Sequence, residues 1–215
     1  MSASVSGIVK LAAAFKDADW LIPAYISIGY LLRLGEKIES ASPNDKRRVL
    51  ERELVLLYDA RYLSRMLLGL YVKIKFVRDF KTQISDSIEA SFSGLDNAAV
   101  ATMIPVLEGV VRKIAVAAQR DVGSGTQKLI GEFDRVLALE NDSPNRLEEK
   151  VIMLQAIRDY FADRILISTY YYSGIDELNR HGILHGIFER YGTKFNFLRL
   201  ITILELLCYI ISHLH

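Results

Sequence analysis

Cysteine, proline and long apolar runs are scarce in this chain, and each scarcity excludes a class of protein. One cysteine and four prolines occur in 215 residues. Cys208, in the run LLCYII, cannot form a disulfide within the chain, so we interpret it as a small buried side chain in a reducing compartment. The most apolar stretches, residues 20–32 and the LLCYII region, are shorter than the roughly 20 residues that span a bilayer. We therefore expect no membrane span.

The sequence also lacks a dominant charge and a targeting leader. Lys and Arg number 27 against 26 Asp and Glu, a net charge of +1, so any nucleic-acid contact needs a local basic patch. The start MSASVSGIVKLAAAF has no basic leader with a cleavage site, which favours a cytoplasmic protein. With 51% hydrophobic and 25% charged residues, the composition excludes intrinsic disorder.

Apolar residues recur three and four positions apart through most of the chain, which predicts an all-α bundle of long helices. The openings SPND at 42–45 and SPNR at 143–146 each offer Ser as N-cap and Pro at the first helical position. We predict that the first helix runs from about Pro43 into FKTQI at 80–84. A third helix should open at Asp96 or its neighbour, with Pro105 either inside it as a kink or at its true start. Residues 121–128 should form a loop.

We favour one continuous helical body. Within it we distinguish an N-terminal helical region at residues 1–95, which is either separate or part of the same bundle, from a second helical domain at residues 96–215. In the last helix, expected from Lys194 to Ser212, polar residues form one stripe and nearly all others are apolar. This pattern is typical of a central, mostly buried helix.

The stretch NRHGILHG at 179–186 contains two of the four histidines of the chain. Arg180 and His185 are five positions apart, roughly 140° around a regular helix, so they converge only where a helix begins, bends or meets a second copy. The imidazole of His185 can move protons near neutral pH, and the guanidinium of Arg180 can hold a phosphate. Such a pair can cleave an RNA phosphodiester without metal, leaving a 2′,3′-cyclic phosphate.

Other readings of this stretch remain open. His181 and His185 are four apart, a spacing that suits two metal ligands, but the other ligands are missing nearby. Arg180 and His185 could instead satisfy a helix terminus. Asn179 and His181 are expected to order the loop, contact phosphate or tune His185, or simply to cap a helix. The run TYYYSG at 169–174 could stack on bases, although at least one tyrosine should be core.

The segment LNRHGILHGIFERYGTKFNFLRLITILELLCYI resembles the C-terminal motif region of the HEPN superfamily. There the motif is R-x4-6-H with a polar residue after the arginine, and Arg180, His181 and His185 match it in that order. The close similarity covers about 35 residues. The resemblance implies an all-α fold and, for active members, a ribonuclease that needs no metal or cofactor. Such members serve in toxin–antitoxin and antiviral defence, and usually act as dimers.

We therefore expect a homodimeric endoribonuclease with RNA as substrate and Arg180 and His185 as catalytic residues. Asn179 and His181 support the site or bind RNA, and an antitoxin or sensor protein would be a further partner. The alternative is a non-catalytic HEPN module that binds RNA, nucleotide or a partner protein. A third class, a helical interaction or membrane-surface protein, would use the apolar residues 20–32.

Overall fold

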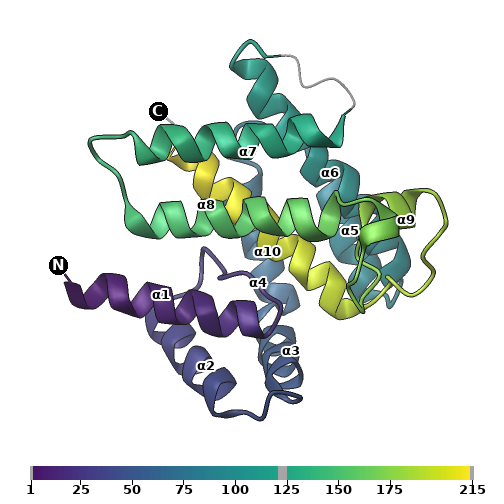
Figure 1. The fold of residues 1–215 in the computed structure, drawn as a ribbon. Helices are drawn as coiled ribbons and strands as arrows, with labels where there is room; N and C mark the ends of the chain where they lie inside the picture. The colour runs from purple at the N-terminus through teal and green to yellow at the C-terminus, as the bar shows by residue number, and fades with distance from the viewer. Residues whose placement is uncertain (1, 121–124, 214–215) are drawn as a thin grey trace.

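The computed structural model describes residues 2–120 and 125–213, and over these residues its regular structure is entirely helical, which confirms the all-α prediction (Figure 1). The α-helices are α1 (Ser2–Asp17), α2 (Ile28–Ser40), α3 (Lys46–Leu57), α4 (Ala60–Met66), α5 (Lys81–Phe92), α6 (Asp96–Ala117), α7 (Thr126–Asn141), α8 (Glu148–Tyr160), α9 (Arg180–Leu184) and α10 (Lys194–Ser212). Short π-helical turns, η1 (Leu67–Tyr71) and η3 (Phe161–Ile165), and short 3-10 turns, η2 (Arg78–Phe80) and η4 (Thr169–Tyr171), join them.

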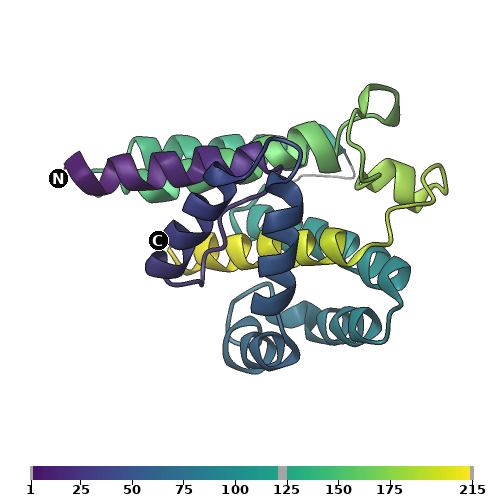
Figure 2. The same cartoon turned by 90° about the horizontal axis from the view of Figure 1, so that it is seen from below.

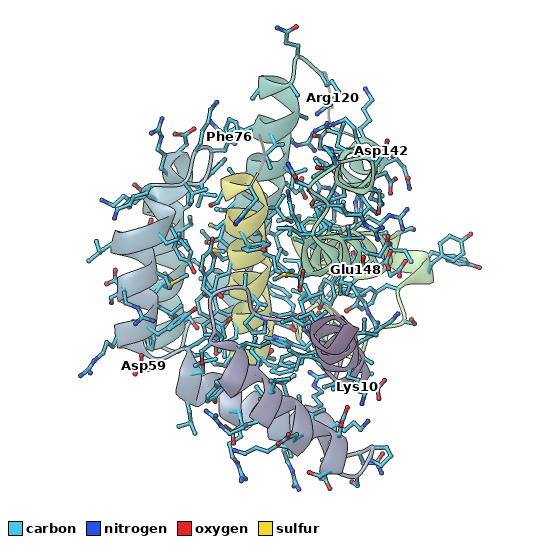
Figure 3. The ribbon with its side chains drawn as sticks, turned by 90° about the vertical axis from the view of Figure 1, so that its left-hand side faces the viewer. Lys10, Asp59, Phe76, Arg120, Asp142 and Glu148 are labelled. Carbon is cyan, nitrogen blue, oxygen red and sulfur yellow. The ribbon has the colours of Figure 1, made fainter. Side chains whose placement is uncertain are left out.

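Helix α10 is the centre of the bundle and has the predicted bounds. It packs against α6, α3 and α8, and Figure 3 shows it in the middle of the molecule with side chains on both sides. The Thr193 hydroxyl caps it by accepting from the backbone N–H of Asn196 at 3.1 Å. By length and composition alone α10 could cross a membrane, but 83% of its most apolar window is buried inside the protein.

The first three residues of the polar stripe of α10, Arg199, Thr202 and Glu205, face the interior. Arg199 is 1% exposed and Glu205 is not exposed at all. Three tyrosine hydroxyls donate to the Glu205 carboxyl group at 3.0, 3.0 and 3.4 Å, those of Tyr58, Tyr62 and Tyr71. Burial raises the pKa of Glu205 to about 8, because desolvation outweighs the opposing effect of these hydrogen bonds.

The prediction of one long helix from Pro43 to residue 84 is wrong. Helix α3 begins at Lys46 and ends at Leu57, since the residues SPND form a turn in which the Ser42 hydroxyl donates to the Asp45 carboxylate at 2.7 Å. Asp59 then caps a new helix, α4, by accepting from a backbone N–H. Because α3 ends at Leu57 and α4 starts anew, the chain bends around α10. This bend places the hydroxyls of Tyr58 and Tyr62 within hydrogen-bond distance of the Glu205 carboxyl group.

The second opening also forms a turn instead of a helix start. The Ser143 hydroxyl accepts from the N–H of Asn145 at 3.2 Å, and α8 begins only at Glu148. The prediction for Asp96 is confirmed, because α6 starts there and contains Pro105. Of the predicted loop at 121–128, residues 121–124 lie outside the described residues, and helix α7 already begins at Thr126.

One hydrophobic cluster runs through both predicted regions, from Leu11 to Ile210. The expected boundary between residues 95 and 96 falls in the turn between α5 and α6, two helices that pack closely together. Figures 1 and 2 show α1, α7 and α8 along one side of the bundle and α5 with α6 on the other. The division into two regions stays a prediction.

Candidate functional site

The predicted motif forms its own short helix, α9, which Asn179 caps. The Asn179 side chain is fully buried, and its Oδ1 accepts from the N–H of Gly182 at 2.9 Å. Its Nδ2 donates to the carbonyl oxygens of Arg164 at 3.0 Å and Ile167 at 2.8 Å. Asn179 thus ties α9 to η3 and the residues directly after it, and its buried side chain orders the motif without offering a surface to a ligand.

The two glycines of the motif end α9. Gly186 has a φ of +67°, the left-handed conformation that follows many helix C-termini. The N–H of Ile187 donates to the carbonyl oxygen of Gly182 at 2.8 Å, and the N–H of Gly186 to that of Ile183 at 3.2 Å. A Cβ at Gly182 would lie 2.2 Å from the Phe188 ring. Both ends of this five-residue helix are therefore fixed by local contacts.

The loop around α9 is anchored to the core helix α10. The buried guanidinium of Arg199 donates to the Asp176 carboxylate at 2.7 Å, and Arg47 also pairs with that carboxylate. Asn196 on α10 donates to the Asp176 carbonyl oxygen at 2.8 Å. The Glu177 carboxylate accepts from the backbone N–H groups of residues 189 and 190 and so closes the loop behind the motif.

Arg180 is the first residue of α9 and reaches back to α6. Its Nε donates to the Glu108 carboxylate at 2.8 Å, and the Arg180 side chain keeps 24% of its surface exposed. Glu108 is 7% exposed and also lies 3.6 Å from a guanidinium nitrogen of Arg112. The sequence reasoning missed Glu108. A detectable signal was a carboxylate within the apolar stretch of α6, where a buried charge needs a partner.

The two motif histidines extend the arrangement outward from Arg180. The Nη1 of Arg180 lies 3.4 Å from Nδ1 of His181. The rings of His181 and His185 are nearly parallel, with centroids 6.0 Å apart. His181 is half-buried and His185 is exposed. Arg180 and His185 are thus linked through His181, in one row that starts at Glu108.

The surroundings of His181 change the pKa of its imidazole. Burial lowers the pKa of His181 below its ordinary value, and the positive charges of Arg180 and His185 lower it further, against the opposing effect of Glu108. The lowered pKa favours the neutral form of His181. Neutral Nδ1 of His181 can then accept from Arg180, provided that the ring proton lies on Nε2.

Exposed apolar and aromatic side chains occur in the segment before the motif, within it and directly after it. Their exposed fractions run from 43% to 85%, and they are Tyr170, Tyr171, Ile175, Leu184 and Ile187. Of the three consecutive tyrosines, only Tyr172 is half-buried, with its ring against Phe188. Within residues 2–120 and 125–213, no group of three or more His, Cys, Asp or Glu side chains is placed to hold a metal ion.

Comparison with known proteins gives no family for this chain. No protein-family model, no curated protein and no solved structure matches it. The functional argument therefore depends on the residues of α9 and their surroundings.

Proposed function

We propose that the protein is a metal-independent endoribonuclease whose site is built around α9. The observation that supports this proposal is the row of Arg180, His181 and His185 on a rigidly capped helix at the surface. Side chains held by fixed elements keep the positional accuracy that proton transfer and phosphate binding require. The HEPN-like motif points to the same chemistry.

Each side chain of the row has a role in the proposed reaction. Glu108 holds Arg180 through Nε, while among the described residues the two Nη groups have only the 3.4 Å contact with His181. Arg180 can therefore bind a phosphate and stabilise charge at phosphorus. The exposed imidazole of His185 takes the proton of the 2′-hydroxyl or returns one to the 5′-oxygen. Neutral His181 orients Arg180 and spaces it from His185.

Two copies of the chain complete the site in this proposal. Cleavage needs a proton acceptor and a proton donor, and one chain offers a single exposed motif imidazole. An isologous dimer whose axis passes near α9 duplicates Arg180 and His185 in one cleft. Leu184 and Ile187, exposed apolar residues beside His185, favour this surface as the contact, because a second copy would remove them from water.

The first test is incubation of the purified protein with mixed RNA in excess EDTA. We expect the wild type to leave 2′,3′-cyclic phosphate ends, and Arg180→Ala and His185→Ala to lose at least about a hundredfold in rate, the usual contribution of an acid–base group. His213→Ala is the matched control, because this imidazole contacts Tyr209 at the far end of α10. Equal activity in all four proteins would assign the cleavage to another site or a contaminant.

The dimer is tested by mixing the wild type with an inactive variant. Because one cleft needs the His185 imidazoles of both copies, a mixed dimer with His185→Ala should be inactive, so excess His185→Ala should lower the activity of a fixed amount of wild type. Ile187→Asp, a change at an exposed apolar residue, should shift the protein towards monomer in sedimentation and lower the rate. A fully active monomeric Ile187→Asp protein would refute the two-copy site.

The second candidate is a non-catalytic HEPN module that binds RNA, nucleotide or a partner protein. The ion pair between Arg180 and Glu108 favours it, because a paired guanidinium can serve folding alone. RNA that binds without cleavage, with weaker binding in Arg180→Ala, would support this candidate.

A role in defence or toxicity predicts that expression arrests bacterial growth for the wild type and not for His185→Ala. An antitoxin or sensor would then be the natural partner, acting in the cytoplasm.

A further inference from the structure

A cavity of about 660 Å³ lies between α1 and α8, and Leu206 of the core helix α10 lines it as well. This volume is in the usual range for sites that hold small organic molecules. Figures 1 and 3 show α1 and α8 side by side, with Lys10 on one and Glu148 at the start of the other. Small side chains on the facing helices leave the space open, namely Ala12 and Ala13 of α1 and Ala156 of α8.

One part of the cavity wall is apolar. It consists of residues shortly after α1 and near the start of α8, namely Leu21, Ile22, Val151, Ile152 and Met153. Contact with such side chains removes apolar surface of a ligand from water, which is favourable roughly in proportion to the area buried. A ligand that fits this cavity therefore carries an apolar body.

Three charged residues of the wall, all half-buried, are paired within the protein. The Asp19 carboxylate lies 3.1 Å from a guanidinium nitrogen of Arg199 and 3.4 Å from one of Arg164. The Asp159 carboxylate lies 3.2 Å from a guanidinium nitrogen of Arg158. A charged group of a ligand would compete with these pairs instead of finding a free partner.

The remaining charged residues of the wall, Lys16 and Asp163, have opposite signs and are exposed to water. Water screens exposed charges, so each of them attracts a ligand charge only weakly. A charged ligand group that entered the cavity would lose its hydration without a buried opposite charge to replace it, which is unfavourable. The charges of the wall therefore favour a neutral ligand.

Tyr160 supplies an unused polar group to the wall. Tyr160 is 8% exposed and lines the cavity, and its hydroxyl makes no hydrogen bond with any described residue. Nor is this oxygen among the fully enclosed side-chain atoms without a partner, which within the described residues belong to Trp20, Arg120 and Arg199. The hydroxyl is therefore open to the cavity, where it can donate to or accept from a neutral oxygen.

We propose that this cavity binds a neutral small molecule with an apolar body and one hydroxyl or carbonyl oxygen. The oxygen pairs with the Tyr160 hydroxyl, and the apolar body lies along Val151 to Met153. The inference does not depend on the proposed ribonuclease activity, because no residue of α9 lines the cavity. Octanol is a suitable probe, and octylamine and octanoate carry a similar chain with a cationic or an anionic head at pH 7.

Trp20 gives a direct readout. It is the only tryptophan of the chain, it lines the cavity, and it is 3% exposed. We expect a saturable change in Trp20 emission on titration with octanol, confirmed by calorimetry, and at least tenfold weaker binding of octylamine and of octanoate. Absence of saturable octanol binding by both methods would overturn the proposal. So would octylamine or octanoate binding as tightly as octanol.

Tyr160→Phe tests the polar contact. It removes the hydroxyl but no hydrogen bond within the described protein, so this variant should fold as the wild type does. It should weaken octanol binding about fivefold, the effect of one lost neutral hydrogen bond. Tyr170→Phe is the matched control, because Tyr170 is 85% exposed and does not line the cavity. Unchanged octanol affinity in Tyr160→Phe would refute the assigned contact.

Ala156→Phe tests the location. It fills part of the space that Ala156 leaves open and should abolish octanol binding. Circular dichroism checks that the variant is folded, and Tyr160→Phe carries the test if it is not. A folded Ala156→Phe protein that binds octanol as tightly as the wild type would refute the site.

Discussion

Replacing Asn179 should cost more stability than any other single change in the motif. In Asn179→Ala, α9 loses its cap, which contributes about 1 kcal/mol. Two buried carbonyl oxygens, those of Arg164 and Ile167, also lose the donor that they now share. At about 1 kcal/mol for each unsatisfied group, the total loss in the free energy of unfolding is about 3 kcal/mol.

Asn179→Asp separates the contribution of the helix cap from that of the two hydrogen bonds to carbonyl oxygens. The carboxylate keeps the acceptor for the N–H of Gly182 but places negative charge against the two carbonyl oxygens. At pH 7 this variant should be at least as unstable as Asn179→Ala. Below about pH 5 the carboxyl group takes up a proton and can donate to one carbonyl, so Asn179→Asp should regain part of the loss, whereas Asn179→Ala should not.

Urea unfolding followed by circular dichroism measures the loss, and amide hydrogen exchange at Gly182 shows whether α9 opens locally. Asn145→Ala is the matched control, because Asn145 is exposed in the turn before α8, and a surface change of this kind stays within about 0.5 kcal/mol. If Asn179→Ala unfolded with the same midpoint as Asn145→Ala and Gly182 exchanged no faster, the buried cap would have no role in holding the motif.

Three further predictions follow. The pKa of Glu205 is raised by burial to about 8 from 4.5, so the folded state keeps a proton that the unfolded state releases, and stability falls as pH rises through this window. The fall is on the order of 5 kcal/mol, at about 1.4 kcal/mol per pKa unit, and Glu205→Gln should flatten it. Parallel pH curves for the two proteins would contradict this. Gly182→Ala should destabilise the protein by about 1–3 kcal/mol, because its new Cβ would clash with the Phe188 ring. Phe188→Ala removes that clash, so the double variant should lose less stability than the two single losses added together. A double variant that loses the full sum would count against this packing. His181 should titrate in NMR below its ordinary pKa and closer to it in Arg180→Ala, whereas an unchanged midpoint would remove Arg180 as a cause.

Sequence reasoning succeeded where one local pattern decided the structure. The bounds of α10 follow from a capping Thr193 and an apolar run, and the start of α6 follows from Asp96. It failed between residues 43 and 84, where the apolar period continues but the chain turns at Tyr58 and Asp59. The capping Asp59 was a local signal that the prediction overlooked. The hydrogen bond from the Tyr58 hydroxyl to the Glu205 carboxyl group spans 147 residues, and no local pattern contains it.

For the candidate site, the local sequence likewise predicted which residues take part but not how they are arranged. Arg180, His181 and His185 were visible in eight residues of sequence, as was Asn179 as a possible cap. Their arrangement was not visible, because the partner that positions Arg180 is Glu108, 72 residues earlier on α6. The bridging position of His181 between Arg180 and His185 also required the actual course of the short helix.

A comparison of two arginines explains why Arg180 is suited to bind an anion and Arg199 is not. Arg199 is 1% exposed, and its Nη groups donate to two carboxylates, those of Asp176 and Asp19, and to the carbonyl oxygen of Asp19. Both of its Nη groups are therefore engaged within the protein, and one of them holds the Asp176 loop to α10. Arg180 is 24% exposed, and its single ion pair engages Nε. The same fold thus uses one guanidinium to fix the motif loop and holds another with its Nη groups available for a phosphate.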